Sequence, residues 1–229
     1  MTRAAAESLL RAAAHVLVDN VDAPVLDDPS SRHVFRVLRV RDGETVTVTD
    51  GRGAWRVCRA VGGLIEPDGE LRFEPAAVNP LTIAFAIPKQ DRPEWIVQKL
   101  TELGVDRIVL LHADRSVVRW DAARAAKHLA RLRRIATEAL QQSRRTWLPT
   151  IEGPVDSSGL FDELGGAVVA EPGGRDLTAA DRVIAIGPEG GWSPTELEVA
   201  AGQVSLGSTV LRVETAALVA AARAADHAM

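Results

Sequence analysis

Short apolar runs separated by turn residues fill the first third of the chain. Residues 45–49 alternate strictly between threonine and valine, which is typical of a strand with one buried face. Apolar and β-branched runs predict strands at 16–18, 34–38, 45–49, 54–60 and 70–73. Asp-Gly and Gly-Gly pairs separate several of these runs, and short strands at this spacing favour a small β-barrel followed by a linker over 74–80.

Beyond residue 80, expected strands alternate with expected helices. Apolar runs predict strands at 81–87, 108–111, 167–170, 183–186 and 204–206, and helical patterns predict helices at 91–103, 121–142, 194–201 and from Thr215 onward. Residues 152–166 are rich in Gly, Pro, Ser and Asp, so a long loop with a short helical turn is expected there. The alternation predicts an α/β domain with a mainly parallel sheet.

Composition places the chain among globular proteins. Hydrophobic residues make up 46% and charged residues 25% of the 229 residues, which excludes wholesale disorder and a fibrous repeat. No apolar run reaches the roughly 18 residues of a membrane span. Arg3, Glu7 and Arg11 interrupt the alanine-rich start, so a helical leader is expected there rather than a secretory signal or a transit peptide.

The single cysteine and the scattered histidines bear on compartment and metal chemistry. Cys58 has no partner for an internal disulfide, which fits a reducing, cytoplasmic compartment, and we expect it to pack in a strand rather than act as a nucleophile. The histidines are His15, His33, His112, His128 and His227. Their spacing does not match a metal motif, so a metal enzyme is not expected.

Basic residues are concentrated in two blocks, although the formal net charge is −4. Residues 30–59 carry seven arginines against three acids, residues 115–145 carry nine basic residues against two acids, and residues 146–229 carry four basic residues against twelve acids. Such asymmetry is typical of a phosphate-binding face. The excess of arginine over lysine, 24 to 3, fits either bidentate phosphate recognition or the coding bias of a GC-rich genome.

The long helix expected at 121–142 carries much of the second basic block. Its arginines lie largely outside the apolar stripe of the helix. The helix therefore presents either a solvated face or, with Arg145 and Trp147 at its end, an RNA-facing surface.

Two loops are unlike ordinary connections. Residues 186–193 (Ile-Gly-Pro-Glu-Gly-Gly-Trp-Ser) follow a buried strand, and their glycines would let the backbone approach a ligand closely at the carboxyl end of a parallel strand. The loop has neither the lysine of a Walker A sequence nor a GxGxxG pattern, so by itself it indicates only a turn. Residues 206–216 lead into an alanine-rich helix that Thr215 or Glu214 would cap. Arg212 and Glu214 are two residues apart, and an ion pair at a plain strand-to-helix corner would explain them.

Together these loops resemble a known family. The runs that carry the resemblance are Gly187-Pro188-Glu189-Gly190-Gly191 and Leu206-Gly207 followed by Leu211-Arg212-Val213-Glu214-Thr215-Ala216. Further matches are His33, Val37-Leu38-Arg39, Lys99-Leu100-Thr101-Glu102-Leu103-Gly104-Val105, Arg115-Ser116-Val117, Trp120 and Gln142-Ser143-Arg144-Arg145. In this order, the chain resembles the SPOUT (trefoil-knotted) RNA methyltransferases, and within them the small-subunit (16S) rRNA uridine-N3 methyltransferases. Gln141 departs from the pattern, because the family usually has glutamate there, which argues against a carboxylate role at that position.

The resemblance implies a fold, a cofactor and partners. The fold would be a PUA-like β-barrel over residues 1–75 and a knotted (SPOUT) α/β domain with a mainly parallel sheet over residues 80–229. The cofactor would be S-adenosylmethionine, and the partners would be small-subunit ribosomal RNA and a second copy of the chain that completes the active site, with no membrane and no metal. The residues expected to form the cofactor pocket are Ala170, Glu171, Ile186, Gly187, Gly190, Gly191, Leu206, Gly207, Leu211 and Arg212.

The resemblance also implies roles in catalysis. Uridine N3 must lose its imide proton as it attacks the methyl group, so the site needs a base, an anion stabiliser or both. We expect Arg145 and Arg212 to orient the target base and stabilise its developing anion. Glu214 is the candidate general base and Glu189 its rival, and the alternative for Glu214 is a helix-capping carboxylate paired with Arg212. The residues expected to bind rRNA are His33, Arg36, Arg39, Arg115, Arg119, Trp120, Gln142 and Arg145.

Three alternatives stay open on the sequence alone. A non-catalytic RNA-binding or ribosome-assembly factor of the same fold would not bind the cofactor. A SPOUT enzyme that acts on another RNA position would differ in the modified nucleotide. A generic nucleotide-dependent α/β enzyme would need a phosphate-binding lysine or a ribose-binding carboxylate pattern, and the sequence shows neither.

Overall fold

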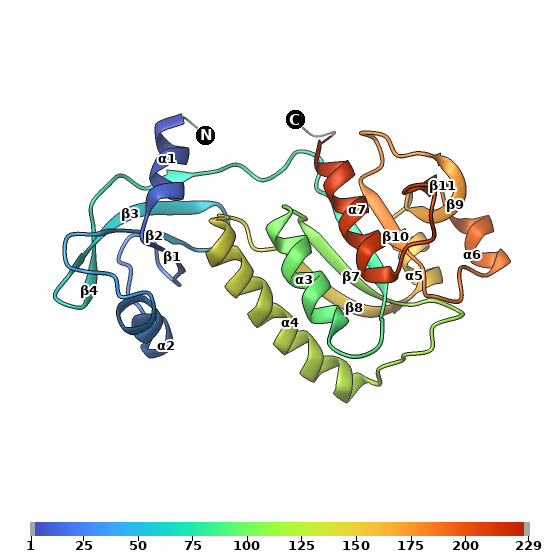
Figure 1. The fold of residues 1–229 in the computed structure, drawn as a ribbon, viewed down its shortest axis with the longest axis horizontal. Helices are drawn as coiled ribbons and strands as arrows, with labels where there is room; N and C mark the ends of the chain where they lie inside the picture. Colours follow the sequence, from blue (N-terminus) through green and yellow to red (C-terminus); the bar gives the residue numbers. More distant parts are fainter. Residues whose placement is uncertain (1–2, 227–229) are drawn as a thin grey trace. The chain divides into compact units, whose positions relative to one another are not determined.

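The computed structural model describes residues 3–226 and divides them into two compact units (Figure 1). The first unit runs to Ala76 and includes residues 137–148 as well. The second unit contains residues 77–136 and everything from Pro149 onward. The C-terminal end of one long helix therefore belongs to the first unit, which the sequence-based domain limits of 1–75 and 80–229 do not anticipate.

The first unit is built on a five-stranded sheet that follows helix α1 (Arg3–Arg11). Its strands are β1 (Ala14–Leu17), β2 (Thr45–Thr49), β3 (Ala54–Val61), β4 (Leu64–Pro67) and β5 (Arg72–Phe73). They pair in the order β1-β2-β3-β4, with β5 beside β3, and only the β1–β2 pair is parallel among these strands. The β-rich character is confirmed, whereas closure into a barrel stays a prediction.

The strand expected at 34–38 was a wrong prediction, because this segment is helical. Helix α2 (Asp28–Arg32) continues into the π-helical turn η1 (His33–Val37). Asp27 caps α2, because its carboxylate accepts the backbone N–H of Ser30 at 2.9 Å, and Pro29 occupies the first turn. These start signals outweigh the β-propensity of the apolar residues, and the helical turn buries Val34 completely.

Strand β2 is buried on both faces, although its alternation predicts one exposed face. Thr47 and Thr49 are as buried as the valines between them. The Thr49 hydroxyl donates to the carbonyl oxygens of Ala54 and Thr146, so its burial is compensated by hydrogen bonds. Cys58 lies in the core beside this strand, and burial raises the pKa of its thiol to about 11, which supports a packing role.

The second unit contains a six-stranded sheet in which every adjacent pair is parallel, as predicted. The strand order is β11 (Gly202–Ser205), β9 (Val168–Asp176), β10 (Val183–Ile186), β6 (Thr82–Ala86), β7 (Arg107–His112) and β8 (Thr150–Asp156). Helices α5 (Ser157–Glu163) and α6 (Pro194–Val199) pack near one face, where Leu160 and Phe161 join a core with Val109 and Ala185. Helices α3 (Arg92–Glu102) and α7 (Val213–Asp226) pack against each other, and α7 lies against β6 and β10. Whether the chain is knotted stays a prediction.

Two details of this unit correct the sequence-based expectations. Most of the loop expected at 152–166 is strand β8 and helix α5. Gly153 allows the strand to form, because a side chain there would place its Cβ only 2.5 Å from the carbonyl oxygen of Leu110 on β7. Helix α7 begins at Val213, so Glu214 and Thr215 both lie inside its first turn and neither is the residue that precedes the helix.

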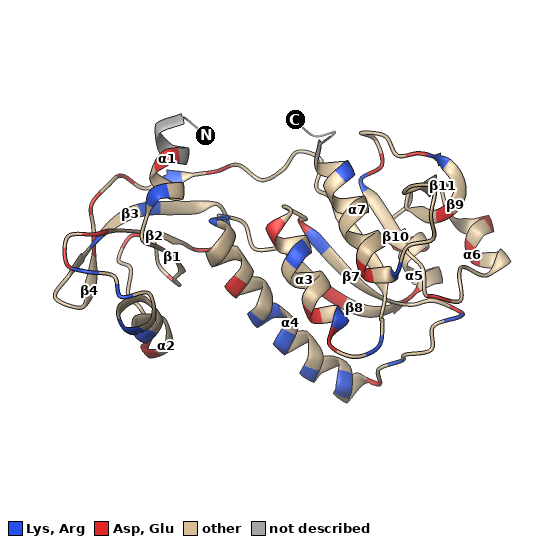
Figure 2. Cartoon of the chain, viewed as in Figure 1, with Lys and Arg blue, Asp and Glu red and all other residues tan. Residues whose placement is uncertain are grey.

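Helix α4 (Ala122–Ser143) carries a row of basic residues, visible as the blue segments along it in Figure 2. Within the second unit, Ala125, Leu132 and Ala136 form its buried side. In the part of the chain that the structure describes, no helix is long and apolar enough to cross a membrane.

Candidate functional site

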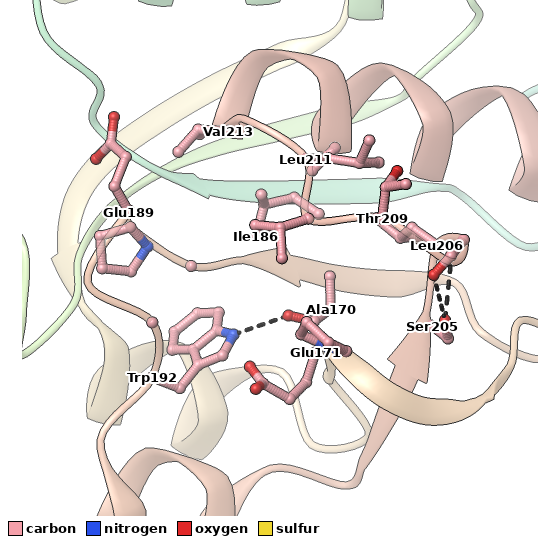
Figure 3. Close-up of a pocket in the computed structure, with 17 residues that line it drawn as sticks. Ala170, Glu171, Ile186, Glu189, Trp192, Ser205, Leu206, Thr209, Leu211 and Val213 are labelled. Atoms are coloured by element: carbon pink, nitrogen blue, oxygen red, sulfur yellow. Dashed lines mark hydrogen bonds between the residues drawn. The ribbon is translucent and has the colours of Figure 1, made fainter.

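A pocket of about 220 Å³ opens beside three neighbouring parallel strands (Figure 3). It lies at the carboxyl ends of β10 and β11 and beside β9 where its pairing with β10 ends at Ala170, and this edge of a parallel sheet is where ligands bind in α/β proteins. The lining residues are Ala170, Glu171, Pro172, Ile186, Gly187, Pro188, Glu189, Gly191, Trp192, Ser205, Leu206, Gly207, Thr209, Val210, Leu211, Val213 and Ala216. All of them belong to the second unit.

The glycine loop after β10 packs directly on a buried tryptophan. Trp192 is 4% exposed, and its indole Nε1 donates to the Ala170 carbonyl oxygen at 3.2 Å, as the dashed line in Figure 3 shows. A Cβ on Gly187 would lie 2.8 Å from Cε2 and 2.9 Å from Nε1 of this ring. Only glycine therefore fits at position 187 while the backbone and the indole keep these positions.

A capping box at the start of α6 anchors the other end of the same loop. The Ser193 side chain accepts the Glu196 N–H, and the buried Glu196 carboxylate accepts the Ser193 N–H at 2.8 Å. Glu196 also accepts the backbone N–H of Asp114, and the Asp114 carboxylate accepts the Ser193 hydroxyl. The loop that follows β7 is thereby fastened to the glycine loop that shapes the pocket.

The pocket brings together eight of the ten residues expected to hold the cofactor. Gly190 and Arg212 are adjacent to lining residues but do not line the pocket themselves. The carbonyl oxygen of Gly190 accepts a hydrogen bond from the Arg115 guanidinium at 3.2 Å. Sequence reasoning missed Trp192 and Val213 as lining residues, although both lie within or beside the two runs that carry the resemblance.

Glu214 lies beside Arg92, a residue that sequence reasoning missed. The Glu214 carboxylate is 3.6 Å from the Arg92 guanidinium, which also lies 4.0 Å from the carboxylate of Glu189. The alternative in which Glu214 pairs with Arg212 gains no support, because the ion pair described for Glu214 is with Arg92. The second carboxylate oxygen of Glu214 is buried and has no hydrogen-bond partner. Arg92 is the first residue of α3. In the sequence, nothing but its charge marks it as a candidate site residue.

Arg145 belongs to the first unit, whereas every pocket-lining residue belongs to the second. Its segment is fastened to the β-sheet of the first unit. The ring of His15 lies 2.9 Å from the Arg145 carbonyl oxygen and 2.8 Å from the Thr47 hydroxyl. The Gln141 side chain accepts the Leu17 N–H at 3.2 Å, so the residue that departs from the family pattern has a structural contact.

Burial lowers the pKa of His15 to about 4, and the nearby Arg144 charge acts in the same direction. The imidazole is therefore neutral at neutral pH. A neutral ring can donate to the Arg145 carbonyl oxygen through one nitrogen and accept from the Thr47 hydroxyl through the other.

The residues expected to contact RNA fall into three groups. His33, Arg36 and Arg39 are exposed on and just after η1 in the first unit, and Gln142 is exposed near the end of α4. Arg115 and Arg119 are exposed in the second unit. Trp120 differs from the others, because its ring stacks on His128 with centroids 4.1 Å apart and is 7% exposed. The indole therefore has little free face on which an RNA base could stack.

Among residues 3–226, no group of three or more His, Cys, Asp or Glu side chains is placed to hold a metal ion. His227, one of the five histidines, lies outside the described residues.

Comparison with known proteins gives a consistent match over most of the chain. Residues 74–225 match an RNA methyltransferase domain, and residues 26–59 match an RNA methyltransferase PUA domain. The chain is 35% identical to ribosomal RNA small subunit methyltransferase E of Mycobacterium bovis, with 89% of this chain and 86% of the relative covered, and 30% identical to the Bacillus subtilis protein of the same name, with 82% and 84% covered. A crystal structure of ribosomal RNA small subunit methyltransferase E from Neisseria gonorrhoeae, bound to S-adenosyl methionine, superimposes with a TM-score of 0.74 at 28% identity and covers 92% of this chain and 95% of its own.

Proposed function

Because the chain belongs to the family of RNA methyltransferases whose members are named ribosomal RNA small subunit methyltransferase E, we propose that it methylates N3 of a uridine in small-subunit (16S) rRNA with S-adenosylmethionine as the methyl donor. The family match supports RNA methylation, and the uridine position is our own step beyond it. We also propose that the protein works in the cytoplasm, where ribosomal RNA is assembled into ribosomal subunits.

The charge of the pocket carries the cofactor assignment. Among the described residues that line it, Glu171 and Glu189 are charged and none is Lys or Arg. A nucleotide polyphosphate would meet two carboxylates and no cation there. S-adenosylmethionine carries a sulfonium and an ammonium group against a single carboxylate, so the acidic lining favours it. The apolar side chains of Ile186, Leu206 and Leu211 suit a purine ring.

The size of the pocket fits a donor that must meet a second substrate. Clefts and cavities that bind small molecules are commonly about 300–1,000 Å³, and this pocket measures about 220 Å³. We therefore expect part of the cofactor to stay exposed at the mouth. Such exposure is required if the base of an RNA substrate is to reach the methyl group.

Glu214 is the best candidate for the proton acceptor. When bound, S-adenosylmethionine supplies a methyl group that its sulfonium has already activated. The chain must align the base and remove the N3 proton. The buried Glu214 oxygen without a hydrogen-bond partner is an acceptor suited to that proton, and Arg92 holds the other oxygen of the same carboxylate. Glu189, the rival, has a side chain that is 55% exposed and reaches Arg92 only at 4.0 Å.

Arg145 and Arg212 are assigned to the developing anion of the base. A guanidinium can donate two hydrogen bonds to a uracil oxygen or to a flanking phosphate. We propose a homodimer in which the active site is completed across the subunit interface. His33, Arg36 and Arg39 on the first unit, Gln142 near the end of α4, and Arg115 and Arg119 on the second unit would hold the RNA.

Calorimetric titration of the purified protein with S-adenosylmethionine tests the cofactor assignment. The demethylated product should bind as well, and NAD, which carries a pyrophosphate, should not. If none of the three binds at about millimolar concentration, the enzyme hypothesis is wrong and a non-catalytic RNA-binding factor remains.

Transfer of a labelled methyl group to unmodified 16S rRNA, alone and in the small subunit, tests the reaction. N3 methylation removes the Watson–Crick donor of uridine, so reverse transcription should stop at the modified position. A product without such a stop would point to another RNA position. Arg145→Ala should abolish transfer and keep cofactor binding, whereas the control Arg59→Ala, on an exposed β3 arginine paired with Asp68, should keep both.

A further inference from the structure

One side of α4 within the second unit is uniformly basic. Its basic residues recur every three or four positions, which places them on one face of a helix. They are Arg124, Lys127, Arg131 and Arg134, all exposed. The buried residues of the same helix, Ala125, Leu132 and Ala136, lie on the opposite side.

This face continues into the loop that leads back to the pocket. The loop between β7 and α4 carries the exposed residues Arg115 and Arg119. The Arg115 guanidinium donates to the carbonyl oxygen of Gly190, whose neighbour Gly191 lines the pocket. The basic track, defined as Arg115, Arg119, Arg124, Lys127, Arg131 and Arg134, therefore starts at the glycine loop and runs onto the outer face of α4.

Acidic groups neutralise only part of the basic track. Glu94 of α3 lies 2.8 Å from Arg131, and Asp156 lies 3.5 Å from Arg119. The Asp121 carboxylate accepts the backbone N–H of Arg124 and so serves as a helix cap. Glu138 follows Arg134 by one helical turn, so six cations face four carboxylates and the track keeps a net positive charge.

The surroundings of His128 report the same positive field. His128 lies on α4 between these residues, with its ring against Trp120. Burial lowers its pKa most, and the charges of Arg124, Lys127 and Arg131 lower it further, while Glu94 opposes them. Several cations close to one ring are the pattern of a surface that attracts an anion.

We propose that the basic track binds the phosphate backbone of the RNA substrate and guides it from the outer face of α4 to the pocket. The inference rests on the proposed function, because RNA is taken as the substrate. A polyanion fits the observations better than a single anion, since the cations are spread along more than two helical turns. The predominance of arginine also suits phosphate groups, which match its planar fork.

The size of the contribution follows from counterion release. The logarithm of the binding constant falls as the logarithm of the salt concentration rises. Removing one phosphate-binding cation makes this slope less steep by about 0.7 for single strands and 0.9 for duplexes. Removing two such cations should therefore lower the slope by roughly 1.4–1.8. At about 0.1 M salt this corresponds to a roughly 25- to 60-fold loss of affinity.

The test is the double variant Arg124→Gln/Lys127→Gln, measured by filter binding to in vitro transcribed small-subunit rRNA between about 0.05 and 0.3 M KCl. The matched control is Ala123→Gln/Ala126→Gln, which adds the same side chains at exposed positions of the same helix without removing charge. We expect weaker binding and a shallower salt slope for the first variant and wild-type behaviour for the control.

Equal affinity and equal salt slope in both variants would overturn the proposal. So would a variant that binds RNA normally but transfers methyl groups slowly, because that points to a role in chemistry. The measurement needs no cofactor, so its outcome is independent of the calorimetric test. A wild-type protein that fails to bind S-adenosylmethionine refutes the proposed function, even if the basic track binds RNA.

Discussion

Replacing Gly187 by alanine should disturb the pocket, because the new methyl group would collide with Trp192. The new methyl group would lie 2.8 Å from Cε2 of Trp192. Carbon atoms in contact prefer about 3.5–4.0 Å, so the loop or the indole must move by about 0.7 Å or more. Trp192 has little freedom to move, because it is buried and donates to the Ala170 carbonyl oxygen.

The free-energy cost of this clash can be estimated from small-to-large substitutions in protein cores. Inserting a methyl group into a packed site costs about 1–3 kcal/mol. If the loop shifts into the pocket, the cost appears as a loss of S-adenosylmethionine affinity of roughly 5- to 150-fold. If the loop holds its place, the same cost lowers the free energy of unfolding. Alanine also stiffens the unfolded chain, which offsets about 0.4–1 kcal/mol of the cost to stability.

Calorimetry with S-adenosylmethionine and urea unfolding should be measured on the same preparation. The matched control is Gly202→Ala in β11, where the nearest atom to the new methyl group is 3.9 Å away and no strain is expected. The reasoning is refuted if Gly187→Ala equals this control in both cofactor affinity and unfolding free energy.

Three further predictions concern charge and pH. Arg92→Ala should lower kcat about tenfold with little change in cofactor affinity, because it removes the cation that holds Glu214. Arg92→Lys should restore part of the rate. An alanine variant with wild-type kcat would contradict this positioning role. Folding should lose stability as pH falls from about 6.5 to 4, because the unfolded chain protonates His15 there while the buried ring stays neutral. The difference between 6.5 and about 4, at ~1.36 kcal/mol per pH unit, corresponds to about 3 kcal/mol, and His15→Gln should flatten that part of a urea-unfolding pH series. A second loss should follow between about pH 4 and pH 2, because the unfolded chain protonates Asp181 there while the Arg175 guanidinium holds the pKa of the native carboxyl at about 2.

The centre of the parallel sheet was predictable because β6, β7 and β10 are short apolar runs. Strand β10 begins and ends where the apolar run at 183–186 does. The pocket was predictable for a related reason, since parallel strands present their following loops at one edge. Two loops distant in the sequence, after β10 and after β11, therefore meet at one pocket.

The elements that sequence reasoning missed depend on contacts with distant residues. The apolar run at 34–38 has strand propensity, but the cap at Asp27 starts a helix six residues earlier and the chain continues in helical form. Strand β8 contains Gly153, which would normally weaken a strand, and is retained because β7 approaches too closely for any side chain. Neither the stacking of Trp120 on His128 nor the proximity of Arg92 to Glu214 has a local signature, since each pair forms only once the helices pack.

Charge separation within the second unit resolves the conflict between an acidic protein and an RNA substrate. The pocket lining carries two carboxylates and suits a cationic donor, while Arg115, bonded to the glycine loop beside it, begins a track of cations that suits a polyanion. A uniformly basic site would attract RNA phosphates into the cofactor pocket, and a uniformly acidic one would repel the substrate. The net charge of −4 is therefore no argument against RNA binding, because the interaction depends on where the charges lie. If this division matters, Glu171→Gln should weaken S-adenosylmethionine binding without weakening RNA binding, and Arg124→Gln/Lys127→Gln should do the reverse.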